Sequence, residues 1–358
     1  MNTNKRRQIQ NKNSVRELHF ILAVFVCVIF FSNDASAQVK IETKKETKSV
    51  ASPVISKSAY KKKAKRIVNE SDAPAEKSIA VDAKVKVQLC VSEGKLKING
   101  WERNEIRAFV GGGSRVGFKV LQKIGQNGTA VWVEVLGFDP AKSNESGADE
   151  CLSGEEIELD VPRGAIVNVK SSESETAIDS VRRVTVETVS GDIFLNNIAQ
   201  GIEAKTHEGD VTVEKSGGAI TLNSSTGNIV AFDVSASEIG DIFRAKTSSG
   251  VITLQQVEHR QMEVDSISGS IRFVGEFQSG GQYNLKTTNG SILLSIPATS
   301  SSKINVSTVF GAFNSEIPLQ NPVKSPNPKA QSLSASIGKG EATLNLTTHT
   351  GSIRIKKQ

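Results

Sequence analysis

The chain has 358 residues, with 44 lysines and arginines against 38 aspartates and glutamates and a formal net charge of +6. Because only 5% of the residues are aromatic and 37% hydrophobic, the composition excludes a polytopic membrane protein, and the length suits two ordinary domains or one extended repeat array. The 29 glycines are close to the average frequency, so their positions matter more than their number.

The first 37 residues are typical of a secretory signal peptide. Basic residues at positions 5–16 precede an apolar run at positions 20–31, which ends before Ala35-Ser36-Ala37. We expect cleavage before Gln38, because signal peptidase accepts small residues at these places. The apolar run is shorter than the roughly 20 residues that span a membrane, and an uncleaved anchor, the alternative, would be the only membrane contact. We therefore expect an exported protein, in the periplasm or at the cell surface or outside the cell.

Residues 38–78 predict a disordered linker, because they are rich in Lys, Glu, Ser and Ala and show no hydrophobic period. Residues 1–78 carry a formal charge of +9, and residues 79–358 carry −3. Nucleic-acid binding by the folded part is not expected, since the basic charge lies outside it. The basic cluster at residues 61–66 suits either a solvated linker or contact with an anionic lipid or cell-wall polymer.

Two cysteines, Cys90 and Cys151, remain after cleavage. Two cysteines in an exported chain permit one disulfide, with a single possible pairing. The sequence does not show whether their Cα atoms come within reach, so the paired and the free states both stay open.

A repeat of about twenty residues begins near residue 184. Its glycines are 18 to 23 residues apart, and then 40 residues apart at the last step. They are Gly191, Gly209, Gly227, Gly250, Gly269, Gly290, Gly311 and Gly351. A fixed period in this range is typical of a stacked repeat architecture.

Each repeat predicts a strand, a glycine turn and a second strand. Apolar residues usually fall seven and five positions before the glycine and two and four positions after it, which gives each strand one buried face. A hydroxyl residue stands three positions before every glycine, and in a stack it could bond a neighbouring side chain or the turn backbone. These residues are Thr188, Thr206, Ser224, Thr247, Ser266, Thr287, Thr308 and Thr348.

The free energy gained by burying the inward side chains of one repeat cannot offset the conformational entropy lost when twenty residues become ordered. Neighbouring repeats must therefore supply the other wall of the core. We therefore predict an all-β protein: a parallel β-helix or β-solenoid with about 20-residue rungs over residues 162–358. A meander of antiparallel hairpins is the second choice. Alternating residues at 79–161 predict a small β-rich entry domain that caps the first rung.

No residue pattern points to catalysis, a metal or a cofactor. His207 and His349, each two positions before a repeat glycine, would lie about 34 Å apart over seven rungs and could not share an ion. Asp192, Asp210 and Asp241 follow turn glycines, but other repeats carry Asn, Ser, Val or Ala there, which favours a turn role.

Sugar-binding sites use aromatic faces, and the repeat region offers few aromatic residues, several of them at core positions: Phe194, Phe232, Phe243, Phe273, Phe277, Tyr283, Phe310 and Phe313. The loop after Phe313 holds four of the nine prolines, Pro318, Pro322, Pro326 and Pro328. Loops on repeat scaffolds often carry recognition, so this loop is the first candidate for a contact surface; a simple insertion without a partner is the alternative.

The entry segment at 92–101, Ser-Glu-Gly-Lys-Leu-Lys-Ile-Asn-Gly-Trp, and the repeated Thr-x-x-Gly-x-Ile-x-Leu units resemble the bacterial putative-adhesin domain family. The resemblance covers about residues 86–358. It implies a β-helical protein of the cell envelope, and the family supplies no catalytic motif that could be carried over.

Together these observations predict an exported, non-enzymatic, adhesin-like β-solenoid that serves as an interaction or structural scaffold. Its expected partners are a cell-surface or cell-wall polymer or protein. A β-helical polysaccharide lyase or hydrolase is the alternative, and clustered carboxylates with a basic residue in one groove would support it.

Overall fold

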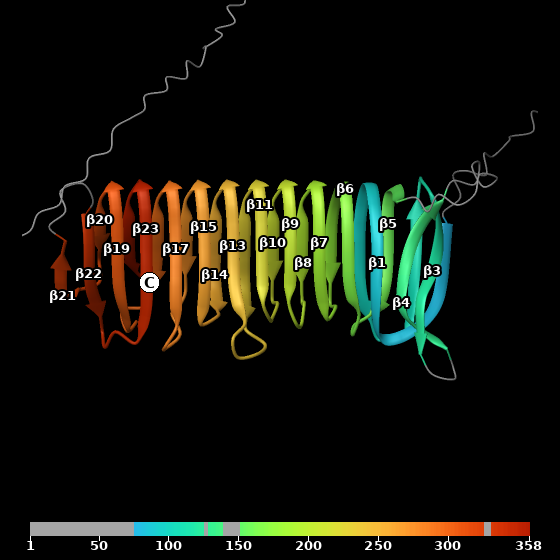
Figure 1. Ribbon diagram of the computed structural model, residues 1–358, viewed down its shortest axis with the longest axis horizontal. Coiled ribbons are helices and arrows are strands. Elements are labelled where there is room, and N and C mark those ends of the chain that lie inside the picture. Colours follow the sequence, from blue (N-terminus) through green and yellow to red (C-terminus); the bar gives the residue numbers. More distant parts are fainter. Residues whose placement is uncertain (1–74, 125–127, 139–150, 326–330) are drawn as a thin grey trace, which may run out of the picture. The chain divides into compact units, whose positions relative to one another are not determined.

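A computed structural model describes residues 75–124, 128–138, 151–325 and 331–358. The chain divides into two units, Met1–Lys65 and Arg66–Gln358, and all described residues belong to the second. The predicted signal peptide, its cleavage site and linker residues 38–74 lie outside the described residues. Within the described ranges there are 24 strands and no helix, so the prediction of an all-β solenoid is confirmed (Figure 1). The described part accordingly contains no helix long and apolar enough to cross a membrane.

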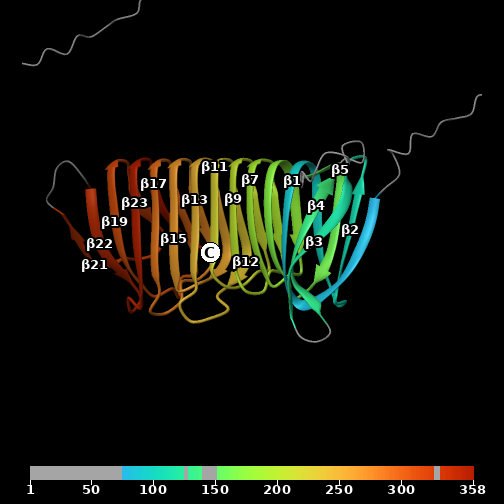
Figure 2. The same cartoon turned by 45° about the vertical axis from the view of Figure 1, so that its right-hand side comes forward.

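The central part of the second unit is a stack of rungs, each made of two strands joined at a repeat glycine (Figures 1 and 2). The rung strands are β7 (Arg183–Ser190) and β8 (Ile193–Asn196), β9 (Ile202–Glu208) and β10 (Val211–Glu214), β11 (Ile220–Thr226) and β12 (Ile229–Ser235), β13 (Ile242–Ser249) and β14 (Ile252–Glu258), β15 (Gln261–Ser268) and β16 (Ile271–Val274), and β17 (Gln282–Asn289) and β18 (Ile292–Ile296).

The first strands of successive rungs pair in parallel, and so do the second strands. We call the two resulting walls the first-strand layer and the second-strand layer. The register keeps equivalent residues side by side; for example, Leu222 lies opposite Ala204 on one side and Ala245 on the other. The predicted inward residues therefore face each other across the rungs, and Leu222, Ile229 and Ala231 have no exposed surface.

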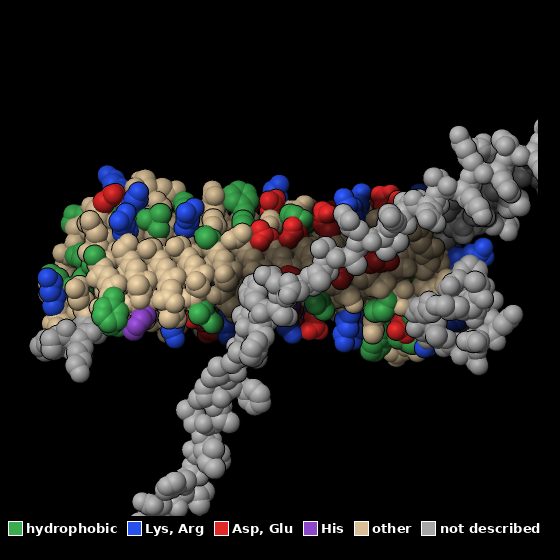
Figure 3. All heavy atoms as spheres, turned by 90° about the horizontal axis from the view of Figure 1, so that it is seen from above, with side chains coloured by type: hydrophobic (Ala, Val, Ile, Leu, Met, Phe, Trp, Pro, Cys, Tyr) green, Lys and Arg blue, Asp and Glu red, His purple; other side chains and the backbone are tan. Residues whose placement is uncertain are grey.

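The repeat glycines form a continuous edge where one layer turns into the other. A Cβ atom built on any of the eight would lie 1.8–2.3 Å from a carbonyl oxygen of the neighbouring rung, closer than real atoms approach. At Gly269, for example, that atom is the carbonyl oxygen of Gly250 at 1.8 Å. Figure 3 looks down on this edge and shows a strip of uncharged atoms with charged side chains on both sides. Glycine is thus required by the close approach of neighbouring turns.

The hydroxyl residues three positions before the glycines point into the solenoid, and all eight are at most 5% exposed. Most donate a hydrogen bond to the glycine carbonyl of the neighbouring rung, as Ser224 does to Gly209 at 2.9 Å and Thr247 to Gly227 at 3.0 Å. The Oγ of Ser266 and the Oγ1 of Thr308 have no such partner among the described residues. The sequence pattern therefore marks a buried ladder that ties each turn to the next.

The N-terminal end contains β1 (Ala75–Trp101), β2 (Glu105–Gly111), β3 (Arg115–Ile124), β4 (Thr129–Phe138), β5 (Leu152–Pro162) and β6 (Ile166–Asp179). The long β1 lies between β6 and β5 and pairs in parallel with both. The antiparallel pairs β1–β2, β2–β5 and β3–β4 then cover this end. Strand β1 begins at Ala75, so residues 75–78 belong to the sheet and not to the predicted linker, and β1 to β5 share one hydrogen-bonded sheet with the rungs.

The C-terminal end departs from sequence order. It contains β19 (Ser302–Phe310), β20 (Phe313–Ser315), β21 (Gln320–Lys324), β22 (Gln331–Ile337), β23 (Ala342–Thr350) and β24 (Ile353–Lys357). The last rung, β23–β24, lies between β17–β18 and β19–β20. The 40-residue interval between Gly311 and Gly351 therefore holds no additional rung; it holds the antiparallel pair β21–β22, which covers the end.

Candidate functional site

The predicted proline contact loop lies at this C-terminal end. Pro318 precedes β21 and Pro322 lies within it, whereas Pro326 and Pro328 are outside the described residues. All five residues of β21 are exposed, and the strand pairs with β22. A proline and a lysine in an exposed edge strand hinder pairing with another chain, so the described part of this loop has a structural reason for its composition.

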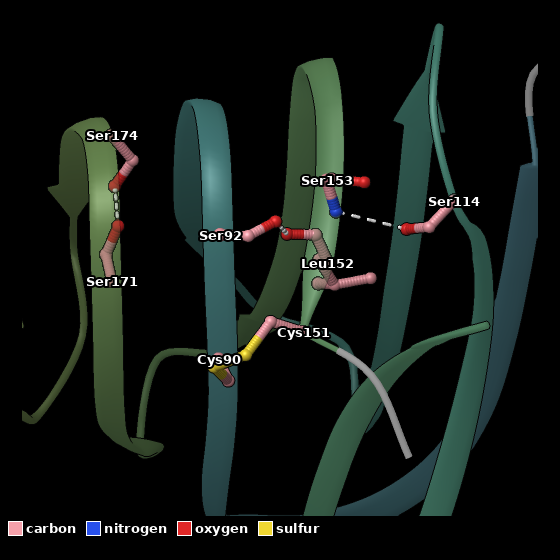
Figure 4. Close-up of a disulfide and its surroundings, with 8 residues drawn as sticks. All are labelled: Cys90, Ser92, Ser114, Cys151, Leu152, Ser153, Ser171 and Ser174. Atoms are coloured by element: carbon pink, nitrogen blue, oxygen red, sulfur yellow. Dashed lines mark hydrogen bonds between the residues drawn. A yellow bond between two sulfur atoms is a disulfide. The ribbon is translucent and has the colours of Figure 1, made fainter. Parts of the chain in front are cut away.

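Cys90 on β1 and Cys151 immediately before β5 form a disulfide, with a Cα–Cα distance of 4.6 Å (Figure 4). Around it, the hydroxyl of Ser92 donates to the carbonyl of Leu152 at 3.2 Å, and the Ser153 amide donates to Ser114 at 3.2 Å. The bridge joins two strands that are 61 residues apart in sequence, so it fastens the end cap.

The three turn aspartates accept hydrogen bonds from backbone N–H groups. The Oδ1 of Asp192 accepts the backbone N–H of Asp210 at 2.8 Å, and Oδ1 of Asp210 accepts the N–H of Asn228 at 2.7 Å. Asp241 accepts the N–H groups of Ser237 and Glu238 at 2.9 and 2.8 Å and so closes a loop. These bonds favour the turn role over a catalytic one for the three aspartates.

The inserted rung brings the two turn histidines closer together than sequence order implies. His207 on β9 and His349 on β23 are five rung steps apart, about 24 Å, where sequence order predicts seven. They remain too far apart to share an ion. Within the described ranges, no three His, Cys, Asp or Glu side chains converge as a metal site would require.

The strongest candidate site is a groove on the outer surface of the second-strand layer, which we call the Phe194 groove. It crosses β1, β6, β8 and β10 and encloses about 290 Å³. The parallel register sets its outward side chains in two rows: Lys97, Ala177, Phe194 and Thr212 in one, and Asn99, Asp179, Asn196 and Glu214 in the other. Because Ala177 is small, the surface is hollowed between Lys97 and Phe194.

Hydrogen bonds hold the second row in place. Oδ1 of Asp179 accepts from the side-chain amides of Asn196 at 2.7 Å and Asn197 at 3.0 Å, and its Oδ2 accepts from Ser180 at 2.6 Å. Asn99 donates to Glu158 at 3.2 Å and to Asp160 at 3.3 Å. The polar side of the groove is therefore fixed before any ligand arrives.

Two side chains leave the groove open to a ligand, Phe194 and Glu214, and an unpartnered oxygen is buried beside them. The Phe194 side chain is one of the few large apolar groups on the surface, at 42% exposed. Oδ1 of Asn196 is buried and has no hydrogen-bond partner among the described residues. Likewise, no described side chain forms an ion pair or a hydrogen bond with the carboxylate of Glu214. The groove thus offers one apolar surface and one unengaged carboxylate, whereas the Asn196 oxygen lies below the surface.

The charge balance of the groove is negative. The ammonium group of Lys97 pairs with Glu158 at 3.4 Å, so its charge is already matched. At the border, Arg107 forms an ion pair with Asp160, and this carboxylate raises the pKa of Arg107. Asp179 and Glu214 have no cationic partner among the described residues, which leaves two uncompensated carboxylates in the groove.

A second hollow lies at the other end of the same layer. About 240 Å³ is lined by Ser270, Arg272, Ser291, Leu293, Ser352, Arg354 and Lys356, among others. Its three serines are linked by hydrogen bonds, such as that from the Ser352 amide to the hydroxyl of Ser291 at 3.2 Å. Arg272, Arg354 and Lys356 pair with no described carboxylate, so this end of the layer is basic.

Sequence reasoning identified only part of the candidate site. It listed Phe194 only as one of eight aromatic residues of the repeat region, and it did not connect that residue with the polar residues of the groove. The repeat spacing does align Phe194 with Thr212 and Asn196 with Glu214, three and five positions after their glycines. The contribution of β1 follows only from its place in the sheet.

Three comparisons relate the chain to known proteins. The family model described as Toastrack DUF4097 matches residues 66–356. A solved structure from Clostridium sporogenes, described as a putative cell adhesion protein, is 14% identical, with a TM-score of 0.20, and the match covers 80% of this chain and 100% of that one. Among curated proteins none matches this chain. The predicted resemblance to the adhesin-domain family is confirmed, and the chain belongs to the Toastrack DUF4097 family.

Proposed function

We propose that this protein is an exported, non-enzymatic scaffold of the cell envelope, which contacts a surface or cell-wall polymer or protein through the outer surface of its solenoid. The observation that carries the proposal is that the interior of the solenoid is filled, so that only outward side chains are free to contact a partner. The interior is filled by apolar side chains and hydroxyl ladders from one end cap to the other, so the side chains available for recognition lie on two long outer layers.

This arrangement suits adhesion better than chemistry on a small substrate. Successive rungs repeat about every 4.8 Å, and therefore present side chains in straight rows to an extended partner. Both ends of the stack are covered by antiparallel strands, which hinders polymerisation through free edges. A scaffold that exposes long rows of side chains suits the binding of an extended envelope partner.

The proposal is tested with the purified mature chain, from Gln38 to the C-terminus. We expect it to sediment with isolated cell-wall material or with intact cells, and to release no reducing sugar from that material. Failure to bind either preparation would contradict the proposal. Bovine serum albumin, carried through the same sedimentation, measures nonspecific trapping.

A polysaccharide-active enzyme is the second candidate, and the Phe194 groove favours it, since Asp179, Glu214 and Lys97 line one hollow. Against it, three hydrogen bonds already engage the Asp179 carboxylate. Steady release of reducing sugar from a glycan, abolished by Glu214→Gln, would establish the enzyme in place of the scaffold.

A further inference from the structure

We propose that the Phe194 groove binds a short stretch of a neutral glycan. This inference rests on the proposed function, and it names the ligand class and the place of contact. The groove crosses four strands, which at about 4.8 Å per step gives a length of about 14 Å. A few sugar units of an extended chain fit along it, with one sugar beside each row position.

The two rows match the two kinds of surface that a sugar ring presents. The C–H groups of a sugar face form an apolar patch, and the exposed ring of Phe194 beside the small Ala177 offers a matching surface. The hydroxyl groups at the ring edge are donors, and in the second row the carboxylate of Glu214, which no described side chain engages, is their acceptor.

The charge of the groove selects against other ligand classes. Asp179 and Glu214 would repel a phosphate, a sulfate or a uronic acid, because no described cation compensates them. A nucleic acid is disfavoured for the same reason. A bare metal ion lacks the converging ligands it would need within the described residues. A neutral polyol avoids all three objections.

Preorganisation favours binding as well. Asn196 and Asp179 hold each other at 2.7 Å, and Asn197 and Ser180 fix the carboxylate further. Side chains that are already ordered lose little conformational freedom when the ligand arrives. The polar side of the groove is therefore ordered before a ligand binds, as expected of a binding site.

The experiment measures binding of the mature chain to neutral tetra- to hexasaccharides of β-1,4-linked glucose, xylose, mannose and N-acetylglucosamine. Oligogalacturonate serves as the acidic probe. We expect at least one neutral oligosaccharide to bind, and Phe194→Ala and Glu214→Gln each to weaken it about tenfold. Phe310→Ala is the matched control, because Phe310 is 68% exposed on β19, away from the groove, and its loss should change affinity less than about twofold.

Several outcomes would overturn the inference. One is binding of no neutral oligosaccharide; another is binding that Phe194→Ala and Glu214→Gln leave unchanged although circular dichroism shows both variants folded. Binding of oligogalacturonate alone, lost in Arg354→Ala, would assign the ligand to the basic hollow. If both groove variants keep the oligosaccharide affinity of the unaltered chain and still sediment with wall material, the groove inference is wrong while the proposed scaffold function stands.

Discussion

The repeat glycines are the residues on which the stack depends most directly. At Gly269 a Cβ atom would lie 1.8 Å from the carbonyl oxygen of Gly250, which belongs to backbone and cannot swing aside. We expect Gly269→Ala to lower the free energy of unfolding by about 1–3 kcal/mol, as overpacking does. Urea unfolding followed by circular dichroism measures it. Gly111→Ala is the control, because its Cβ would make ordinary contacts, with the Phe109 ring at 3.5 Å and the Glu156 carbonyl oxygen at 3.8 Å; equal effects of the two would refute the close-approach argument.

The hydroxyl ladder permits a matched comparison between two serines. Ser224 donates to the Gly209 carbonyl at 2.9 Å, whereas Ser266 is equally buried and has no partner among the described residues. Ser224→Ala should cost about 1 kcal/mol or more, since the carbonyl loses its donor, and Ser266→Ala should be nearly neutral. Thermal or urea unfolding distinguishes them. A larger loss for Ser266→Ala would mean that the ladder does not stabilise the turns.

The buried His259 makes the stability of the solenoid depend on pH. Its ring is fully buried beside Phe243, and the distance from Nε2 to the Gly218 carbonyl is 2.9 Å. Because that carbonyl can only accept, Nε2 carries the proton, and Nδ1 lies buried with no partner among the described residues. Burial lowers the pKa of His259 below its ordinary value of 6.5, although the contact with the Gly218 carbonyl and the carboxylate of Asp241 oppose the shift. The unfolded chain therefore takes up the proton more readily than the folded one.

We consequently expect the stabilisation that comes from burying a neutral His259 to be intact above pH 6.5. The free energy of unfolding should decline as the pH falls below that value, by up to about 1.4 kcal/mol per pH unit. His259→Gln, which keeps a donor for Gly218, should flatten the decline. His349→Gln at an exposed position should not. Urea unfolding at several values between pH 5 and 8 measures the slopes, and identical slopes for all three proteins would contradict the assignment.

At the scale of elements, the disulfide between β1 and β5 is expected to hold the end cap. Closing a loop of 61 residues restricts the unfolded chain and stabilises the fold by about 4 kcal/mol in the chain-entropy account. Reduction, or a Cys90→Ser and Cys151→Ser double variant, should lower the urea midpoint accordingly. The double variant in reducing agent serves as the control, and an unaltered midpoint on reduction would show that the bridge does not contribute.

The order of elements shows where sequence reasoning ends. Apolar positions around Gly209 and Gly227 predicted the strands and their inward faces correctly, because one repeat contains all the information that its alternation needs. The position of β23–β24 was not predictable in the same way. Gly290 and Gly311 are 21 residues apart, a normal repeat, yet the rung of Gly351 separates them. That choice depends on which rung best covers β17 and on the cap formed by β22, and both are long-range properties.

The candidate site shows the same limit. Phe194 was one of eight aromatic residues listed for the repeat region, and its neighbours are ordinary Lys, Asn, Asp and Glu residues of the kind found on any solvated strand. Only the parallel register places Lys97 and Asn99 of β1 beside Ala177 and Asp179 of β6. Since β1 precedes β6 by some eighty residues and pairs with it across the cap, no local pattern in the sequence contains this contact.

On the scale of the whole molecule, family membership, a filled interior and two capped ends of the solenoid support the proposed scaffold, which would contact its partner through rows of outward side chains. The folded part carries a net charge of −3, while the basic charge lies in residues 1–78. Adhesion requires the solenoid to be accessible from outside the cell. That requirement is independent of which ligand the Phe194 groove takes.

Fractionation of the producing cells, combined with protease treatment of intact cells, tests this account most directly. We predict that the chain is absent from the cytoplasmic fraction and that external protease removes it from intact cells while a cytoplasmic marker stays whole. A chain that stays in the cytoplasm, or that protease reaches only after the envelope is broken, would contradict a role in adhesion.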